Sequence, residues 1–222
     1  TRLTDVTGVQ TCALPICICA ERSPRKIASV GAIVFTQDGI GGPAAQDISR
    51  LLADELADAR SDIGLCIDVL PQTPSPQLDG QLQQRLSACA RKSISNVLAD
   101  LVPRRLAATL CTLAHCDGQI QAAQVSREMR RAIAVLLKAL PVNVTGTRPI
   151  AEATVTCGGV DRRQIDPKTM ASKVCTGLYF AGEVIDADGP CGGYNLQMCF
   201  STGALAGHSA ARSLSTESPS TA

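Results

Sequence analysis

The segment from Leu178 to Arg212 constrains the fold of this chain most, because its pattern predicts a strand, a glycine-containing loop and a long helix. Leu178-Tyr-Phe-Ala181 is apolar and is expected to form a buried strand that runs into Gly182-Glu183. After a loop, Gly192-Gly-Tyr-Asn195 is expected to open a helix that continues to Arg212. The chain is therefore expected to combine strands and helices rather than to belong to an all-helical or all-strand class.

This strand–loop–helix pattern has the chemistry of a nucleotide-type site. A helix N-terminus presents unpaired N–H groups and the positive end of the helix dipole, which suit a pyrophosphate. Glycines allow the backbone to approach a ligand closely, and the carboxylate of Glu183 can accept hydrogen bonds from sugar-type hydroxyls such as those of a ribityl chain. Gly203 and Gly207 would let the helix pack closely on a sheet. By spacing alone, an ordinary structural turn with glycines is an equally good explanation.

The residues before this segment predict short strands and a block of helices. Strands are expected over 27–35 and 63–69, and Pro43 suits the first position of a helix that follows Gly39-Ile-Gly-Gly42. Apolar stripes at helical spacing predict three helices between Leu78 and Leu140, and Ser126 is placed to cap the third. Further short strands are expected over 142–144 and 151–156.

Composition excludes several classes of partner. The net charge is +1, aromatic residues make up 2% and Trp is absent, so we expect no nucleic-acid partner and no membrane partner but a small-molecule substrate. The chain has 11 cysteines, an odd number in a long sequence, which favours buried thiols in a reducing, cytoplasmic compartment over a disulfide framework. Cys111, His115 and Cys116 form the one Cys/His cluster, and we expect buried thiols there rather than a metal site.

The first 16 residues require a separate interpretation. Val6 to Ile16 matches, codon by codon, a translated sequencing adapter, and Cys12 to Ala20 lacks the charged start expected of a signal peptide. We therefore leave residues 1–16 out of the expected fold as an artefact. On this interpretation the natural coding sequence continues upstream and contains a strand–GxGxxG–helix.

The motifs of the C-terminal part together resemble those of the YhiN/BaiN-type NAD(P)/FAD-dependent flavoproteins. The resemblance is carried by Ala151-Glu-Ala-Thr-Val-Thr-Cys-Gly-Gly-Val160, Ile165-Asp-Pro-Lys-Thr-Met170, Gly177-Leu-Tyr-Phe-Ala-Gly-Glu183 and Gly192-Gly-Tyr-Asn-Leu-Gln197. It extends more loosely over Gly31-Ala-Ile-Val-Phe-Thr36 and covers residues 27–210. The resemblance implies an α/β fold, present in this chain as α+β.

The resemblance also implies a domain organisation and a reaction. Residues 17–142 would be the remnant of a largely helical inserted domain, and residues 143–213 the C-terminal segment of a Rossmann-like FAD-binding domain, followed by a disordered tail over 214–222. The parent enzyme would be an FAD-dependent oxidoreductase that transfers hydride between NAD(P)H and a small substrate, with the flavin supplying the chemistry. The fragment by itself is expected to be inactive.

Residue by residue, the resemblance places a set of positions at the flavin. Gly158 and Gly159 would lie near the isoalloxazine, and Gly182 and Glu183 at the ribityl and phosphate region. The set of cofactor-binding residues implied in this way is Gly158, Gly159, Gly182, Glu183, Asp188, Gly192, Gly193, Tyr194, Asn195 and Leu196. No side chain is assigned as a catalytic acid or base, and no metal is expected. Gln37 and Cys191 depart from the family pattern, which leaves the substrate side less defined.

Gly39-x-Gly-x-x-Ala44 has the spacing of a dinucleotide fingerprint, but three residues separate it from the preceding strand, whereas the fingerprint turn is tight, so we expect no true fingerprint here. Two alternatives to the flavoprotein interpretation stay open. The chain could also be a non-catalytic fragment that binds no flavin. It could finally be a helical interaction module in which the block from Leu78 to Leu140 is the functional part.

Overall fold

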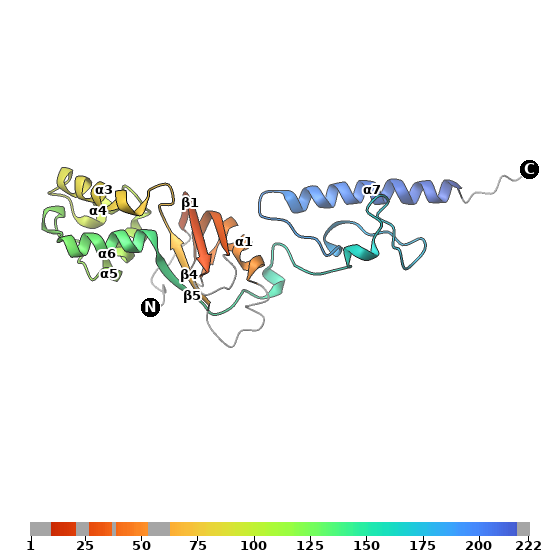
Figure 1. The fold of residues 1–222 in the computed structure, drawn as a ribbon, viewed down its shortest axis with the longest axis horizontal. Coiled ribbons are helices and arrows are strands. Elements are labelled where there is room, and N and C mark those ends of the chain that lie inside the picture. Colours follow the sequence, from red (N-terminus) through yellow and green to blue (C-terminus); the bar gives the residue numbers. More distant parts are fainter. Residues whose placement is uncertain (1–9, 21–26, 37–38, 53–62, 217–222) are drawn as a thin grey trace, which may run out of the picture. The chain divides into compact units, whose positions relative to one another are not determined.

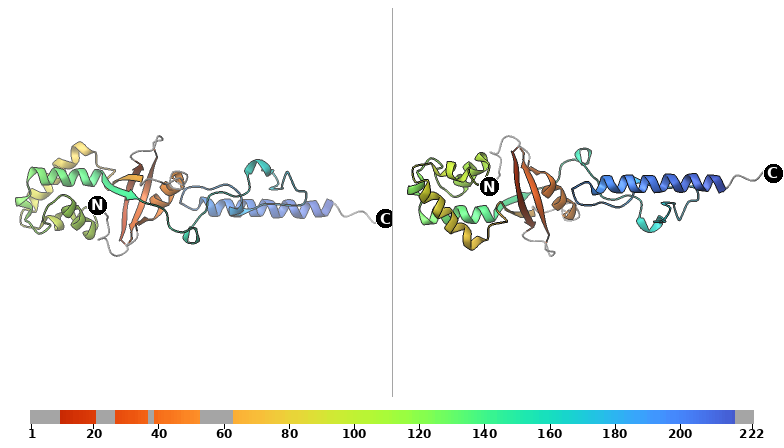
Figure 2. Two further views of the ribbon diagram at one scale, coloured as in Figure 1. Left: turned by 90° about the horizontal axis from the view of Figure 1, so that it is seen from below. Right: turned by 90° about the horizontal axis from the view of Figure 1, so that it is seen from above.

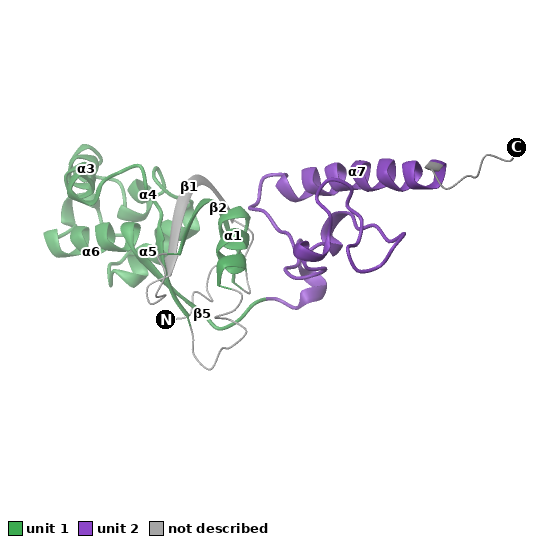
Figure 3. Cartoon of the chain, turned by 45° about the vertical axis from the view of Figure 1, so that its right-hand side comes forward, with its two compact units in different colours: residues 1–147 green, residues 148–222 purple. Residues whose placement is uncertain are grey.

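The computed structural model describes residues 10–20, 27–36, 39–52 and 63–216, and these fall into two compact units. Unit 1 covers residues 1–147 and unit 2 covers residues 148–222, as coloured in Figure 3. The division lies just beyond the boundary expected at 142/143. Each unit is described by itself.

Unit 1 is built around a five-stranded antiparallel sheet with the strand order β3-β2-β1-β4-β5. Its strands are β1 (Gln10–Ala20), β2 (Ala28–Phe35), β3 (Ile40–Gly41), β4 (Ile63–Asp68) and β5 (Leu140–Val144). The central strand β1 pairs with both β2 and β4. A strand with neighbours on both sides has its backbone groups satisfied on both edges, so β1 is the centre of this unit.

The structure changes two of our expectations about which residues belong to this sheet. Residues 10–16, which we left out of the fold, lie in β1, where Gln10 is opposite Phe35 and Cys12 is opposite Ile33. Their interpretation as adapter sequence stays a prediction. Asn143 and Val144, which we assigned to the flavin segment, pair with Gly64 and Ile63 of β4 and so lie in unit 1.

One helix packs on the β2 side of the sheet. Helix α1 (Pro43–Leu51) begins with Pro43 at its first turn, as expected, and buries Ala44 and Ile48. Gly31 of β2 lies beneath it, and a Cβ atom at this position would be 3.3 Å from the backbone nitrogen of Ala44. The absence of a side chain at Gly31 therefore allows the helix to approach the strand closely. Figure 2 shows the sheet edge-on, with α1 and the other helices of the unit on opposite sides.

The remaining helices of unit 1 form a small bundle beside β4 and β5 (Figure 1). They are α3 (Ser75–Ala88), α4 (Ile94–Leu98), α5 (Arg104–Leu113), the 3₁₀ helix η1 (Ala122–Gln124) and α6 (Arg127–Lys138). The expected stripes are confirmed as core, with Leu78, Leu82, Leu110 and Leu137 buried in one cluster with the sheet. The expected cap is also confirmed, because the hydroxyl of Ser126 accepts a hydrogen bond from the backbone N–H of Met129 at 3.2 Å.

The end of α6 is attached to the sheet by one lysine. The Nζ atom of Lys138 lies 2.6 Å from a carboxylate oxygen of Asp68 at the end of β4, and both side chains are largely buried. The same ammonium donates to the carbonyls of Leu70 and Thr73, each at 2.9 Å. Three acceptors from β4 and the following loop therefore converge on one side chain of the helix.

We predict that Lys138→Met destabilises unit 1 by about 1–2 kcal/mol, because it leaves a half-buried carboxylate and two carbonyls without their donor while keeping the apolar stem. The measurement is urea unfolding followed by circular dichroism. Arg85→Met, on an exposed side chain of α3, is the matched control and should leave the unfolding free energy unchanged. Equal stability of the Lys138 variant and the wild type would show that the contacts of Lys138 contribute nothing to the free energy of unfolding.

Cys89, Cys111, Cys116, Cys175 and Cys199 are free thiols. Cys111 and Cys116 are buried as expected, and burial is the main reason that the pKa of Cys111 is raised to about 11. Within the described residues, no group of three or more His, Cys, Asp or Glu side chains is arranged to hold a metal ion. Among the described helices, none is both long and apolar enough to span a bilayer.

Unit 2 is mostly loops packed along one long helix. Its regular elements are η2 (Ile150–Glu152), η3 (Arg162–Gln164), η4 (Gly182–Val184) and α7 (Tyr194–Thr216). A small core of Ile165, Met170, Ile185 and Ala206 joins the loops to the helix. The expected helix over 195–212 is confirmed and extends slightly further at both ends.

The strands expected over 151–156 and 178–181 are not formed in this unit. Residues 150–152 form η2, and Tyr179 makes an isolated bridge to Ala171 rather than entering a sheet. A strand needs a neighbouring strand to pair its backbone groups, and the described residues of unit 2 contain only isolated bridges. Residues 178–181 have the apolar composition of a strand, but no strand among the described residues of unit 2 pairs with them.

Candidate functional site

All ten predicted cofactor-binding residues lie in unit 2, on three stretches of chain: 158–159, 182–188 and 192–196. These stretches are separated in sequence but are connected to one another, directly or through α7, by short backbone and side-chain contacts.

The first contact joins Gly158-Gly159 to the segment after Glu183. Val160 donates its N–H to the carbonyl of Val184 at 2.8 Å, and Asp186 donates to the carbonyl of Val160 at 3.0 Å. Gly159 has φ 141°, and a Cβ atom there would overlap the carbonyl oxygen of Val184 and lie 3.0 Å from the nitrogen of Asp186. Gly159 is therefore required for this close approach of two backbones.

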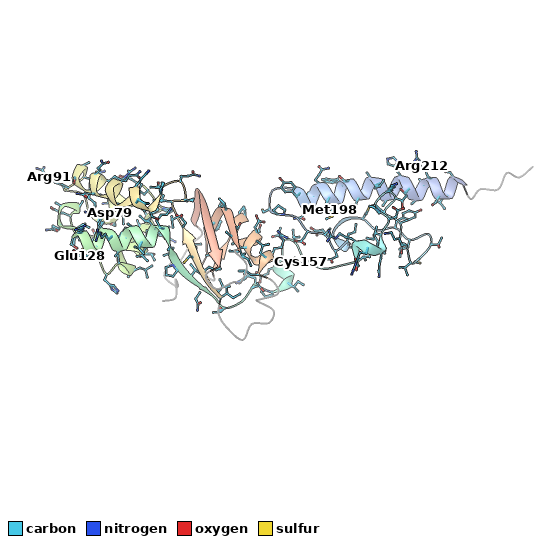
Figure 4. The ribbon with its side chains drawn as sticks, viewed as in Figure 1. Asp79, Arg91, Glu128, Cys157, Met198 and Arg212 are labelled. Atoms are coloured by element: carbon cyan, nitrogen blue, oxygen red, sulfur yellow. The ribbon has the colours of Figure 1, made fainter. Side chains whose placement is uncertain are left out.

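The second contact joins Gly182 to α7. The N–H of Gly182 donates to the hydroxyl of Thr202 at 2.9 Å, and that hydroxyl lies 2.7 Å from the carbonyl of Met198 one turn earlier. Gly182 has φ 72°, and its Cα faces the side chain of Cys199. Met198 is labelled on the helix in Figure 4. The backbone just before Glu183 is thus fixed to the second and third turns of α7.

The third contact joins the loop after Asp188 to the start of α7. The side-chain oxygen of Asn195 accepts from the N–H of Gly189 at 2.8 Å, and its amide nitrogen donates to the carbonyl of Gly189 at 3.0 Å. Both polar atoms of the Asn195 side chain therefore bind the loop backbone. The resemblance implied that Asn195 lies at the pyrophosphate and flavin, and that placement stays a prediction; in this structure the side chain holds the loop backbone at Gly189.

The start of α7 fits a phosphate group. Gly192 and Gly193 precede the helix with φ 135° and 88°, conformations that favour glycine, and a Cβ atom at Gly193 would meet nothing within 4 Å. The first N–H groups of a helix have no partner within the helix and point outwards. Tyr194 and Leu196 are 64% and 65% exposed, and the ring of Tyr194 lies beside Gly192, where a Cβ atom would be 3.5 Å from it. The residues present here fit the anionic part of a dinucleotide.

Glu183 differs from our expectation. We predicted that it ends a buried strand and is held in place, but it lies in η4 and its side chain is exposed. The cause is the unpaired apolar run before it, since without a sheet the chain turns into a 3₁₀ helix at Gly182. Its contact with a ribityl chain stays a prediction. Asp188, also in the predicted set, is half-buried in the following loop.

Sequence reasoning missed two features of this region. Thr202 and Gly189 hold the site together, and the i, i+6 spacing of Gly189 and Asn195 was the available signal. A shallow, open depression of about 440 Å³ is lined by Asp161, Arg162, Arg163 and Asp186. Hydrogen bonds from the side chain and backbone of Arg163 lower the pKa of Asp161 to about 2. The carboxylate of Asp161 and the guanidinium of Arg163 therefore already form an ion pair with each other. Gln37, one of the two departures from the family pattern, lies outside the described residues.

Comparison with known proteins gives one family match and several relatives. A family model for the HI0933-like protein barrel and H2TH domain matches residues 6–155, more than half of the chain. The 3-dehydro-bile acid delta(4,6)-reductase of Clostridium scindens is 30% identical over 181 residues, which are 82% of this chain and 44% of that protein. The ribosomal RNA dihydrouridine synthase of Escherichia coli is 31% identical over 170 residues, 77% of this chain and 40% of that protein.

A second ribosomal RNA dihydrouridine synthase, from Haemophilus influenzae, is 28% identical over 200 residues, which are 90% of this chain and 46% of that protein. The chain therefore spans less than half the length of the curated relatives that it matches. The family model covers nearly all of unit 1 and the first residues of unit 2, so all ten candidate site residues lie beyond it.

Proposed function

Because this chain belongs to the HI0933-like family, the YhiN/BaiN-type flavoproteins, we propose that it is part of an FAD-dependent reductase that takes hydride from NAD(P)H. The names of its relatives share one chemistry. A 3-dehydro-delta(4,6) bile acid and a uridine each contain a C=C bond conjugated with a carbonyl group, and each named enzyme reduces such a bond. We therefore propose a carbonyl-conjugated C=C bond as the group reduced.

The proposed role of unit 2 is to bind and orient FAD as part of a Rossmann-like domain. One observation supports this role: hydrogen bonds link residues 158–160 and 182–186 to each other and to α7. Two glycines with positive φ angles, Gly192 and Gly193, precede this helix. The N–H groups at the start of α7 would bind the pyrophosphate, and Glu183 would accept hydrogen bonds from the ribityl hydroxyls. When bound, the flavin supplies the hydride chemistry, and these residues hold it in place.

Helix α7 also has a surface that supports a larger FAD-binding domain. Leu196, Phe200 and Leu214 are 65%, 71% and 70% exposed, and Gly203 and Gly207 lie between Phe200 and Leu214 on the same helix. Positions 196, 200, 203, 207 and 214 lie on one face at helical spacing. We propose that this face packs on a sheet of the FAD-binding domain. The free, buried thiols Cys111 and Cys116 support a reducing, cytoplasmic compartment.

We predict that Glu183→Ala weakens FAD binding about tenfold, the lower end of the effect of a charge-assisted hydrogen bond, because Glu183 is exposed in this structure. FAD affinity is measured by titration with flavin fluorescence. The protein used is this chain expressed together with any coding sequence that adjoins it in the gene. Glu128→Ala, on an exposed carboxylate of α6, should leave FAD affinity unchanged. The 222-residue chain alone is expected to bind FAD weakly. If Glu183→Ala binds FAD as the wild type does, the ribityl assignment is wrong.

A further inference from the structure

Thr202 of α7 differs from the threonines of helix α5. A Ser or Thr inside a helix commonly donates its hydroxyl proton to a carbonyl one turn earlier, which leaves its lone pairs open. Thr109 donates to the carbonyl of Arg105 at 3.0 Å, and Thr112 donates to that of Ala108 at 3.2 Å. Neither hydroxyl accepts a hydrogen bond from another of the described residues. In α5 these hydroxyls therefore bind only within their own helix.

Thr202 makes the same bond within its helix and adds a second one from outside it. Its hydroxyl donates to the carbonyl of Met198 at 2.7 Å, and its oxygen accepts the N–H of Gly182 at 2.9 Å. Gly182 is 20 residues away in the sequence and belongs to η4. A hydroxyl that donates to a carbonyl is polarised and becomes a better acceptor. Thr202 therefore links two elements of unit 2 through one oxygen atom.

The N–H of Gly182 has no alternative partner inside η4. The first N–H groups of a helical turn have no carbonyl of that turn to bind, so they need an acceptor from elsewhere. Gly182 is half-buried beside α7, where a Cβ atom on it would be 3.6 Å from the Sγ atom of Cys199. The hydroxyl of Thr202 is the acceptor in this structure. Without it, a half-buried donor would lose its hydrogen bond.

The turn that Thr202 holds contains Glu183. The side chain of Glu183 is exposed, and its carboxylate makes no hydrogen bond or ion pair with the residues that the structure describes. Within the described part of the chain, the position of this carboxylate therefore follows from the backbone of η4. That backbone is held at its end by the bond from the N–H of Val160 to the carbonyl of Val184, and at its start by Thr202.

The segment that contains Glu183 is attached to α7 at both ends. Gly182 binds Thr202, and Gly189 binds Asn195, about two turns earlier in the helix. The first attachment is adjacent to Glu183 in the sequence. The two attachments use different side chains and different backbone groups. Loss of the Thr202 hydroxyl is therefore expected to release the start of the segment and to leave its end attached.

We propose that Thr202 is a positioning residue for the cofactor, which holds η4 so that the carboxylate of Glu183 meets the ribityl hydroxyls of FAD. This inference rests on the proposed function, because it requires a flavin in unit 2. It goes further by assigning a role to a hydroxyl that does not itself bind the cofactor, since its proton is donated to Met198 and its oxygen accepts from Gly182. Thr202 acts on FAD binding through Glu183.

The test combines FAD titration with amide hydrogen exchange, in this chain expressed together with any coding sequence that adjoins it in the gene. Thr202→Val keeps the shape of the side chain and removes the hydroxyl, Thr202→Ala removes it without adding apolar bulk, and Thr202→Ser keeps it. Each hydroxyl-free change is also made together with Glu183→Ala. Thr112→Val is the matched control, because it loses only a bond within α5. Circular dichroism checks that every variant folds.

We expect Thr202→Val and Thr202→Ala to bind FAD about tenfold more weakly, the same loss as for Glu183→Ala, because each change removes the same contact with the ribityl chain. Thr202→Ser and Thr112→Val should bind FAD as the wild type does. The double variants should bind no more weakly than Glu183→Ala alone, since two changes that remove one contact are not additive. Hydrogen exchange should become fast at Gly182 and stay slow at Gly189 in the hydroxyl-free variants.

Three results would overturn the role of Thr202 while leaving the proposed function intact. They are wild-type FAD affinity in the hydroxyl-free variants, a loss that multiplies with that of Glu183→Ala to about a hundredfold, and a loss that Thr202→Ser shares. The second of these would mean that Thr202 supports the fold independently of Glu183. If the wild type binds no FAD, the proposed function and the role of Thr202 are both wrong.

Discussion

Replacing Gly159 with alanine is expected to disrupt the candidate site more than any other single change that we consider. The new Cβ atom would overlap the carbonyl oxygen of Val184 and lie 3.0 Å from the nitrogen of Asp186. Both atoms belong to the backbone, so neither can move away as a flexible side chain would. The residue would also keep φ 141°, a conformation that L-residues rarely adopt.

The expected cost of Gly159→Ala is about 3 kcal/mol or more. Strain at an unfavourable backbone conformation costs roughly 1–3 kcal/mol, and separating the two segments breaks both hydrogen bonds of Val160, each contributing about 1 kcal/mol. Amide hydrogen exchange at Val160 and Asp186 is the local measurement, and both should lose protection. Gly80→Ala is the matched control, because Gly80 is exposed in α3 with open space around it, and alanine there should stabilise by up to about 1 kcal/mol. Retained protection in the Gly159 variant would mean that the close approach is absent in solution.

The helical part of the fold could be predicted from the sequence because its signals are local. Apolar spacing placed Leu78, Leu82, Leu110 and Leu137 in the core, and Ser126 capped the helix that it was expected to cap. Pro43 began its helix as expected. A helix satisfies its own backbone hydrogen bonds, so a pattern within one stretch is sufficient to identify it.

Strands depend on distant partners, and here the sequence was less informative. Leu178-Tyr-Phe-Ala181 had the composition of a buried strand, but whether such a run enters a sheet depends on which segments are beside it. Residues 10–16 show the converse, since a segment that we excluded on other grounds pairs with β2 in the centre of unit 1.

The structure links the predicted site residues to one another, while their contacts with a cofactor stay a prediction. The glycine pattern and the family resemblance selected 158–159, 182–183 and 192–196, which the structure links together in unit 2. The hydroxyl of Thr202 could not be identified in this way, because its partner Gly182 is 20 residues away in the sequence, whereas the contact of Gly189 with Asn195 is local and its i, i+6 spacing was missed.

The second large effect is expected for Asn195, which the structure identifies as a positioning residue. Asn195→Ala removes the acceptor of the Gly189 N–H and the donor to the Gly189 carbonyl. Gly189 is half-buried, so each unmatched backbone group costs about 1–2 kcal/mol, and the loop from Asp188 to Gly192 would lose its attachment to α7. If unit 2 binds FAD as proposed, the affinity should fall about a hundredfold, which corresponds to about 3 kcal/mol.

Comparison of Asn195→Ala with Asn195→Asp separates positioning from direct contact with the cofactor. The aspartate keeps an acceptor for the Gly189 N–H but places a carboxylate oxygen against the Gly189 carbonyl, so hydrogen exchange at Gly189 should remain slow in the Asp variant and become fast in the Ala variant. Gln197→Ala, on the same helix and with its side chain bonded to Ser201, should change neither measurement. A hundredfold loss of FAD affinity in the Ala variant with unchanged exchange at Gly189 would contradict the positioning role. It would instead mean that Asn195 turns from Gly189 to contact the flavin when FAD binds.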